Sequence, residues 1–401
     1  MPSTIYEPVK SFNVPLPKPS RVKSTLALDE STKRHVESSR NAIRNLLSHQ
    51  VSDDRLMVVV GPCSIHDTNA ALEYASLLAE AADKHQRELV IIMRVYIEKP
   101  RSTVGWKGLI HDPDYAQDLE NLNQSSIPDL SKGVYTARNV MLEVAKKGLP
   151  VATELLNPLL VYYLDDIVSL GVIGARTTES QTHREMASDM PMPIGIKNGT
   201  DGGLKVAVDA MKAASRPHTV VGFDEDSSLA YHMSGGNPDT FVILRGGSQG
   251  PNFSPKDIQA AEAELLRAGK KPAIVVDCSH GNSSKDYRNQ GAVAACLADQ
   301  IALGAPITGV MIESNINEGR QDVPVKGSKE CLKYGVSITD GCVSWNETES
   351  ILERLATAVR QRQEASTTSS PAEESIPTIM VGQSLADEKH TVQEHTVEVS
   401  V

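Results

Sequence analysis

Eight short apolar runs in this chain each lead into a residue that is able to bind an ion or to move a proton. Parallel strands bring their carboxyl ends to one edge of a sheet or to one face of a barrel, which is where active sites lie. We therefore expect these positions to converge on one pocket. In chain order they carry Cys63, Arg94, Glu154, Arg176, Lys197, Arg245, Asp277 with His280 just beyond it, and Glu313.

Cations are prominent among these residues, although the chain carries a net charge of −11. An acidic protein that gathers guanidinium and ammonium groups in one pocket is suited to binding anions, above all phosphate and carboxylate. The cations are Arg94, Arg176, Lys197 and Arg245. The loop after the second run adds Lys99, Pro100, Arg101 and Ser102, which predicts a second anion-binding site.

A metal site is predicted from four residues of mixed chemistry, Cys63, His280, Glu313 and Asp340. One thiolate, one imidazole and two carboxylates suit a borderline divalent ion such as Mn, Fe, Co or Zn better than Mg or Ca. Each residue alone has a simpler interpretation, because a lone cysteine is more often a small buried hydrophobe than a ligand. The placement of so many of these side chains at strand ends favours the functional interpretation.

The composition excludes several classes of protein. A chain of 401 residues with 40% hydrophobic and 23% charged residues is typical of a soluble globular protein. The negative net charge argues against nucleic acid or an anionic membrane as the main partner. Five scattered cysteines indicate a reducing compartment rather than a disulfide framework. No run approaches the roughly 20 apolar residues of a membrane span, and no signal peptide is recognisable, so we expect a cytoplasmic protein.

The apolar runs alternate with segments of helical period, which is the pattern of repeated βα units. Eight such units predict a (β/α)8 TIM barrel, because an open doubly wound sheet would be expected to carry a glycine-rich dinucleotide turn after its first strand. The predicted strands are 56–60, 89–93, 151–153, 172–175, 193–196, 241–244, 273–276 and 309–312. The predicted helices are 70–85, 132–147, 158–170, 204–214, 255–268, 291–303 and 347–363.

The expected organisation has three parts. Residues 1–50 form an N-terminal arm, extended to about residue 25, and a leading helix; residues 51–363 form the barrel. Residues 364–401 are expected to be a disordered C-terminal tail. The short run Val220 and Val221 is predicted to belong to a β-hairpin inserted before the sixth barrel strand.

Eight sequence motifs lie at or beside the predicted strand ends. They read GPCSIHD from 61, MRVYIEKPRSTVGWKG from 93, GARTTESQTHRE from 174, IKNGTDG from 196, LRGG from 244, DCSHGNSSK from 277, GVMIESNINEG from 309 and SITDGCVSW from 337. Each motif alone is modest, but their order is specific. From about residue 26 to residue 362 the chain resembles the class I 3-deoxy-D-arabino-heptulosonate 7-phosphate (DAHP) synthases of microbial and fungal type.

This resemblance implies a metal-dependent transferase that condenses phosphoenolpyruvate with erythrose 4-phosphate at the start of the shikimate pathway, as a homodimer or homotetramer. It implies that the metal ligands are Cys63, His280, Glu313 and Asp340. The residues implied to hold phosphoenolpyruvate are Arg94, Lys99, Arg176, Lys197 and Arg245, with Glu154 close by. Those implied to meet the sugar phosphate are Lys99, Pro100, Arg101, Ser102 and Asp340. Glu154 and Lys99 are the candidates for proton transfer.

Three segments depart from the pattern of the family. A usual Thr-Lys-x-Gly segment is replaced by residues 222–228, a common Pro-Gln-Tyr is Val161-Tyr162-Tyr163, and a small polar residue is replaced at Met190-Pro191. The resemblance implies that these segments form the pocket for an inhibitory aromatic amino acid. We therefore expect weak or absent feedback inhibition.

Two other functions stay open at this point. The chain is either a diverged paralogue that uses another aldose phosphate in a specialised pathway, or a non-catalytic regulatory homologue. The intact metal and phosphate motifs argue against the second alternative, because a non-catalytic subunit has no physical need for this ligand set.

Overall fold

The computed structural model describes residues 14–48, 53–101, 105–115, 128–323 and 331–368. Its strands are β1 (Leu56–Gly61), β2 (Leu89–Arg94), β3 (Val151–Glu154), β4 (Leu170–Ile173), β5 (Ile194–Lys197), β6 (Thr219–Phe223), β7 (Leu229–Met233), β8 (Thr240–Leu244), β9 (Ile274–Asp277) and β10 (Ile307–Glu313). Its α-helices are α1 (Pro19–Thr25), α2 (Glu30–Ser48), α3 (Thr68–Lys84), α4 (Leu130–Lys146), α5 (Gln181–Asp189), α6 (Lys205–Ala214), α7 (Pro255–Arg267), α8 (Gln290–Ala302) and α9 (Trp345–Thr368). Two 3-10 helices are η2 (Leu160–Tyr163) and η3 (Tyr287–Asn289).

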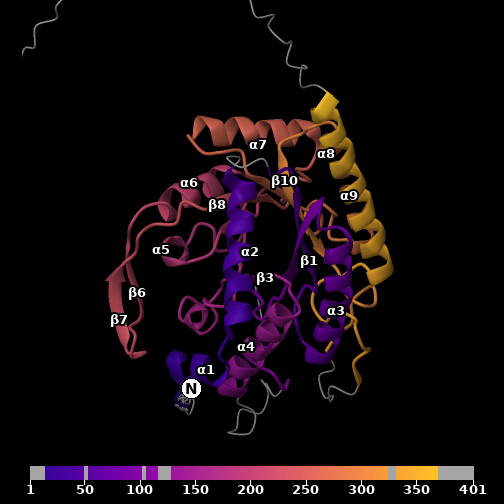
Figure 1. Ribbon diagram of the computed structural model, residues 1–401. Coiled ribbons are helices and arrows are strands. Elements are labelled where there is room, and N and C mark those ends of the chain that lie inside the picture. The colour runs from indigo at the N-terminus through magenta and orange to yellow at the C-terminus, as the bar shows by residue number, and fades with distance from the viewer. Residues whose placement is uncertain (1–13, 49–52, 102–104, 116–127, 324–330, 369–401) are drawn as a thin grey trace, which may run out of the picture.

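Eight of the strands form a closed parallel barrel in the order β1-β10-β9-β8-β5-β4-β3-β2. The pairing of β1 with β10 closes the ring, with Gly61 opposite Glu313. The other two strands, β6 and β7, form an antiparallel hairpin between β5 and β8, at the left edge of Figure 1. The predicted (β/α)8 barrel with a hairpin before its sixth strand is confirmed.

The interior of the barrel is filled by every second residue of its strands, because successive strand residues point to opposite faces. Examples are Met57 and Val59 of β1 and Phe241 and Ile243 of β8, all fully buried in one cluster. Side chains of α2 belong to the same cluster, so this helix closes the amino-terminal end of the barrel (Figure 1). They are Ile43, Leu46 and Leu47.

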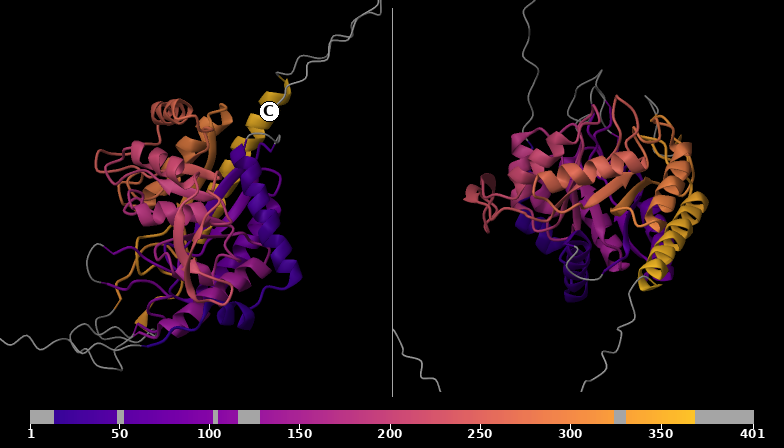
Figure 2. Two further views of the ribbon diagram at one scale, coloured as in Figure 1. Left: turned by 90° about the vertical axis from the view of Figure 1, so that its left-hand side faces the viewer. Right: turned by 90° about the horizontal axis from the view of Figure 1, so that it is seen from above.

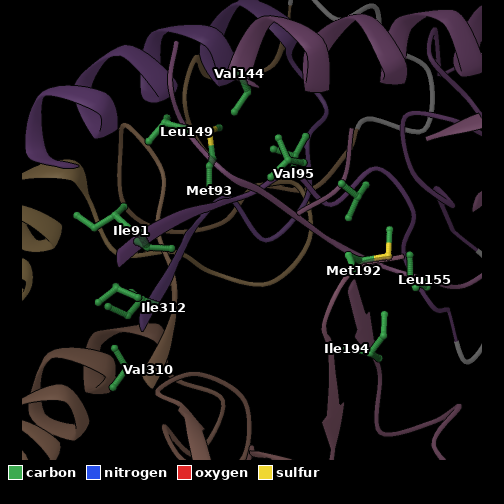
Figure 3. Packing of buried hydrophobic residues seen from close by; sticks show 14 of the residues in the cluster. Ile91, Met93, Val95, Val144, Leu149, Leu155, Met192, Ile194, Val310 and Ile312 are labelled. Atoms are coloured by element: carbon green, nitrogen blue, oxygen red, sulfur yellow. The ribbon is translucent and has the colours of Figure 1, made fainter. Parts of the chain in front are cut away.

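The outward-facing strand residues pack against the surrounding helices. Ile91 and Met93 of β2 lie in this outer cluster, and Figure 3 shows Met93 beside Leu149 and close to Val144 of α4. Helix α9 lies along the outside of the barrel against α8 (Figure 2). None of the helices in the described ranges is long and apolar enough to cross a membrane.

The predicted helix 158–170 is wrong. The segment forms only the short η2, and its last residue, Leu170, already belongs to strand β4. The carbonyl oxygens of the segment accept hydrogen bonds from two arginines instead. Arg138 donates to the carbonyl oxygen of Tyr163, and Arg40 donates to those of Asp165 and Val168. Carbonyl groups held in this way fix a series of turns rather than a regular helix.

The prediction of an extended arm is wrong for residues 19–25, which form α1. Pro19 stands at the first helical position, where its fixed φ favours a helix, and Val22 is fully buried in the core. The tip of the hairpin supports this helix, since Ser227 Oγ accepts a hydrogen bond from the Ser20 amide at 2.9 Å. At the other end, α9 continues to Thr368, so the first residues of the predicted tail are helical. Residues 1–13 and 369–401 lie outside the described ranges.

Arg138 on α4 ties three segments together and gives a test of the fold. The buried guanidinium donates to the carbonyl oxygens of Leu26 and Tyr163 and to both oxygens of Asp166, at 2.7 to 3.0 Å. We expect Arg138→Ala to lower the free energy of unfolding by about 3 kcal/mol, because it strands these acceptors. Chemical denaturation measures the change.

The control is Arg267→Ala, which removes a largely exposed side chain paired with Glu264. This substitution should cost no more than about 0.5 kcal/mol. Equal losses in the two variants would show that the Arg138 network does not stabilise the fold.

Candidate active site

The candidate site residues lie at the carboxyl end of the barrel, directly above the apolar side chains that fill its interior. The alternation that points Val59, Ile92, Ala152, Ile243 and Val275 inward continues two residues further along each chain segment. The positions reached are Gly61, Arg94, Glu154, Arg245 and Asp277, and Lys197 and Glu313 end their strands in the same way. The strand register therefore turns an apolar interior into a charged one at the carboxyl end.

Three of the four predicted metal ligands form one group. One ligand atom from each of Cys63, Glu313 and Asp340 lies within 4.8 Å of the others, and Cys63 Sγ is 3.7 Å from Asp340 Oδ2. Cys63 and Glu313 are fully buried, whereas Asp340 is exposed. A thiolate and two carboxylates fit a borderline divalent ion.

The fourth predicted ligand, His280, lies beside this group. Its Nε2 is 3.9 Å from Glu313 Oε1, and its Nδ1 is 2.9 Å from Asp277 Oδ2. His280 has a φ of 55°, a left-handed conformation that only a few per cent of non-glycine residues adopt. The contact of Nδ1 with Asp277 leaves Nε2, the ring nitrogen on the side of Glu313, available for a metal ion.

The protonation states of this group depend on its burial. Burial and the Glu313 charge raise the pKa of Cys63 to about 11, against the opposing effect of Lys99, whose Nζ is 3.0 Å from Sγ. Burial also disfavours the charge of Glu313, but His280, Arg94 and Lys99 outweigh it and lower its pKa to about 2. Without a metal ion, therefore, the thiol is protonated at neutral pH and the carboxyl is ionised.

Two of the predicted cations are buried and paired. Arg94 Nη2 donates to Glu313 Oε1 at 3.0 Å, and Lys197 Nζ donates to Asp277 Oδ2 at 2.7 Å. The Arg94 guanidinium also lies 4.0 Å above the ring of Tyr96, and its buried Nη1 has no hydrogen-bond partner within the described residues. A buried donor without a partner is unfavourable, so this nitrogen is suited to an incoming anion.

The other two cations are more accessible. Arg245 is half-buried, and its backbone amide is held by Asn198 Oδ1 at 2.7 Å. Arg176 is exposed in the turn after β4, three residues beyond the strand end at Ile173, so the prediction that it directly follows a strand over 172–175 is wrong. In the loop after β2, Lys99 and Pro100 are half-buried.

The remaining members of this loop and of the site are placed as follows. Arg101 is exposed, and its Nε donates to Trp106 O at 2.9 Å, whereas Ser102 lies outside the described residues. Glu154 is buried at the end of β3. A Cβ atom on Gly174 would lie 2.1 Å from Glu154 Oε1, so only glycine leaves room for this carboxylate.

Sequence reasoning missed the residues that support these side chains. Asp277 was expected only as a strand end, yet its carboxylate contacts both Lys197 and His280. Tyr96 lies under Arg94, and Ser279 Oγ donates to Glu313 Oε2 at 2.9 Å. The two-residue alternation from Ile92 through Arg94 indicates that Tyr96 faces inward, whereas no sequence signal identifies Ser279.

Metal binding should release a proton, because a thiolate rather than a thiol is the ligand. With a thiol pKa near 11 and Glu313 already ionised, one proton must leave Cys63 at any pH from 6 to 9. The Mn²⁺ affinity should therefore rise with pH, by about tenfold per unit for each proton released. Calorimetry in buffers of different ionisation enthalpy counts the protons.

Cys63→Ala should release about one proton fewer and bind Mn²⁺ at least tenfold more weakly. Cys296→Ala, at a half-buried cysteine on α8 outside the site, is the matched control and should leave both quantities unchanged. An unchanged proton count in Cys63→Ala would remove the cysteine from the ligand set.

Comparison with known proteins identifies the family of this chain. The family model described as the DAHP synthetase I family matches residues 46–353. The chain is 47% identical over 352 residues to the tyrosine-inhibited phospho-2-dehydro-3-deoxyheptonate aldolase of Schizosaccharomyces pombe, covering 87% of this chain and 92% of that protein. It is 46% identical to the phenylalanine-inhibited enzyme of Saccharomyces cerevisiae, covering 89% and 94% of the two chains.

A solved structure supports the same relationship. The phospho-2-dehydro-3-deoxyheptonate aldolase of Francisella tularensis superposes with a TM-score of 0.82 at 43% identity, covering 88% of this chain and 99% of that one. On the strength of the family match, the identities and the barrel, this chain belongs to the DAHP synthetase I family.

Proposed function

We propose that this chain condenses phosphoenolpyruvate with D-erythrose 4-phosphate to give DAHP and inorganic phosphate, the first step of the shikimate pathway. The observation that carries the proposal is that Arg94, a buried cation, is paired with Glu313 of the group of Cys63, Glu313 and Asp340. A second buried cation, Lys197, is paired with Asp277, which also contacts His280. This arrangement suits an anionic substrate held next to a divalent ion. The membership of the DAHP synthetase I family supports the same reaction.

Phosphoenolpyruvate binds to the cations of the barrel interior. Arg94, Lys197 and Arg245 come from three different strands, and Arg176 closes the set from the loop after β4. Cations fixed by strands hold phosphate and carboxylate in one orientation, so that C3 of the substrate faces its partner. Arg94 Nη1 and the amine of Lys197 provide the donors in the dry part of the site.

A divalent ion would be held by Cys63, His280, Glu313 and Asp340. When bound, the ion supplies Lewis-acid polarisation of a substrate carbonyl group. The thiolate in this set favours Mn, Fe, Co or Zn over Mg and Ca.

The sugar phosphate binds at the loop after β2, where Lys99 and Arg101 supply positive charge. The new bond forms between C3 of phosphoenolpyruvate and the aldehyde carbon, water adds at C2, and phosphate leaves with the electrons of its C–O bond. Burial opposes the charge of Lys99, but Cys63 and Glu313 outweigh it and raise the pKa of the amine, so Lys99 stays protonated at neutral pH and does not act as a base. Glu154 is the candidate to accept a proton from the water.

We also propose a cytoplasmic homodimer or homotetramer. The outer face of the hairpin supports self-association, since Val221, Leu229, Tyr231 and Met233 are each more than half exposed. The described cysteines are all free, as expected in a reducing compartment. Sedimentation velocity of the purified chain measures the oligomeric state.

The reaction is tested with purified protein, Mn²⁺ and both substrates. One phosphate should be released for each phosphoenolpyruvate consumed. The kcat/KM for erythrose 4-phosphate should be at least tenfold higher than for other four- and five-carbon aldose phosphates. A better aldose phosphate would overturn the choice of second substrate. Absence of phosphate release with Mn²⁺, Fe²⁺, Co²⁺ and Zn²⁺ in turn would reject the reaction itself.

The role of Glu154 is tested through the glycine that makes room for it. Gly174→Ala places a methyl group against the Glu154 carboxylate and should lower kcat/KM by about 10- to 100-fold, because the carboxylate must move. Gly235→Ala is the matched control, since its Cβ meets no atom within 4 Å. Equal activity of the two variants would contradict a role for Glu154 in the reaction.

Inhibition by free aromatic amino acids should be weak or absent. Two of the segments that depart from the family pattern meet in the structure, where Tyr162 packs edge-on against Phe223. The Tyr162 hydroxyl also donates to Asp189, the residue before the third segment, at 3.1 Å. A Cβ on Gly222 would lie 2.3 Å from the Tyr162 hydroxyl, so this ring fills the space between the segments. Millimolar Phe, Tyr or Trp should leave phosphate release within about twofold of the uninhibited rate; strong inhibition by any one would contradict the expectation.

A further inference from the structure

Asp277, at the end of β9, is a fully buried carboxylate with three contacts in the site. Its Oδ2 lies 2.7 Å from Lys197 Nζ and 2.9 Å from His280 Nδ1, and its Oδ1 accepts from the Ser279 amide at 2.9 Å. A single oxygen atom therefore contacts both a phosphate-site cation and a predicted metal ligand.

Glu313 repeats this arrangement on the other side of the imidazole. Its Oε1 accepts from Arg94 Nη2 at 3.0 Å and lies 3.9 Å from His280 Nε2. The ring of His280 thus lies between two buried carboxylates, and each carboxylate is paired with one of the two buried cations. The same two carboxylates, Asp277 and Glu313, therefore contact both the cations proposed to bind the anion and the imidazole proposed to bind the metal ion.

We propose that Asp277 is a positioning residue that couples the two sites, so that metal ion and phosphoenolpyruvate each raise the affinity of the other. The proposal rests on the proposed function for the identity of the anion. It does not require the condensation itself.

The sign of the coupling follows from the shared oxygen. An anion that binds to Lys197 partly neutralises the ammonium group, so Lys197 attracts the Asp277 carboxylate less strongly. The carboxylate then interacts more strongly with Nδ1 of His280. A stronger carboxylate partner makes the imidazole a better metal ligand. Linkage requires that the metal ion increase the affinity for the anion by the same factor.

The alternative is a purely structural ion pair. Lys197 and Asp277 are both buried, and breaking such a pair destabilises a protein wherever it lies. A structural pair would affect the thermal stability of the protein but would not change how one ligand alters the affinity of the other. The measurement must therefore be the coupling and not activity.

The experiment measures Mn²⁺ affinity by calorimetry with and without saturating phosphoenolpyruvate and without any aldose. In the wild-type chain phosphoenolpyruvate should tighten Mn²⁺ binding about tenfold, within the usual range for coupled sites. In Asp277→Asn the affinity without phosphoenolpyruvate should fall by about 10- to 100-fold, as for other second-sphere partners of a metal-binding histidine. The effect of phosphoenolpyruvate should then drop below about threefold.

Asp165→Asn is the matched control, because Asp165 forms its ion pair with Lys23 of α1 and not with a residue of the site. This variant should retain the tenfold coupling. Coupling that survives in Asp277→Asn, or that is absent from the wild-type chain, overturns the proposal.

Lys197→Met keeps the proposal testable if Asp277→Asn does not fold. Removing the amine frees Asp277 for His280, so Mn²⁺ affinity without phosphoenolpyruvate should rise several-fold, and an unchanged or weaker affinity contradicts the proposal. The outcome is separable from that of the proposed function. A chain that releases no phosphate but shows the coupling supports this inference and rejects the reaction, and the reverse result does the opposite.

Discussion

Four charged side chains at the carboxyl end of the barrel must neutralise one another, and the shape of the site depends on this requirement. Arg94 is paired with Glu313 and Lys197 with Asp277, and all four are almost completely removed from water. A charge buried without a partner costs several kcal/mol, so none of the four can be lost without disturbing the others. The pairs hold the site in place before any ligand arrives, and the unpaired Nη1 of Arg94 leaves hydrogen-bonding capacity for a ligand.

The same strands that build the apolar core also build this charged layer. Phe241 and Ile243 fill the barrel, and the next inward position of the same strand segment is Arg245. Because the side chains alternate strictly, a shift of one residue in register would send the whole set to the outer face among the helices. The helices around the barrel, and α2 at its amino-terminal end, therefore support the site indirectly, because they fix the register of the strands.

Much of this arrangement was predictable, and the exceptions have physical causes. The apolar runs located the barrel strands because strands buried on both faces read as continuous hydrophobic segments. The helix expected at 158–170 did not form, since Arg138 and Arg40 take its carbonyl groups, and such partners are distant in the sequence. The gathering of charged side chains at the carboxyl end of the barrel was predictable from their places at strand ends. The sharing of Asp277 between Lys197 and His280 was not, since it accompanies a left-handed turn at His280 that the sequence does not reveal.

The closure of the barrel has a consequence for the order in which this protein is made. Cys63 follows the first barrel strand and Glu313 ends the last, and Cys63 and Asp340 are separated by 277 positions in the chain. During synthesis the ligand group does not exist until almost the whole described chain has left the ribosome. A metal ion cannot nucleate this fold in the way that zinc organises a small finger, and long-range closure of this kind is slow. A metal ion that binds to this proposed ligand group can do so only after the ring of strands is complete.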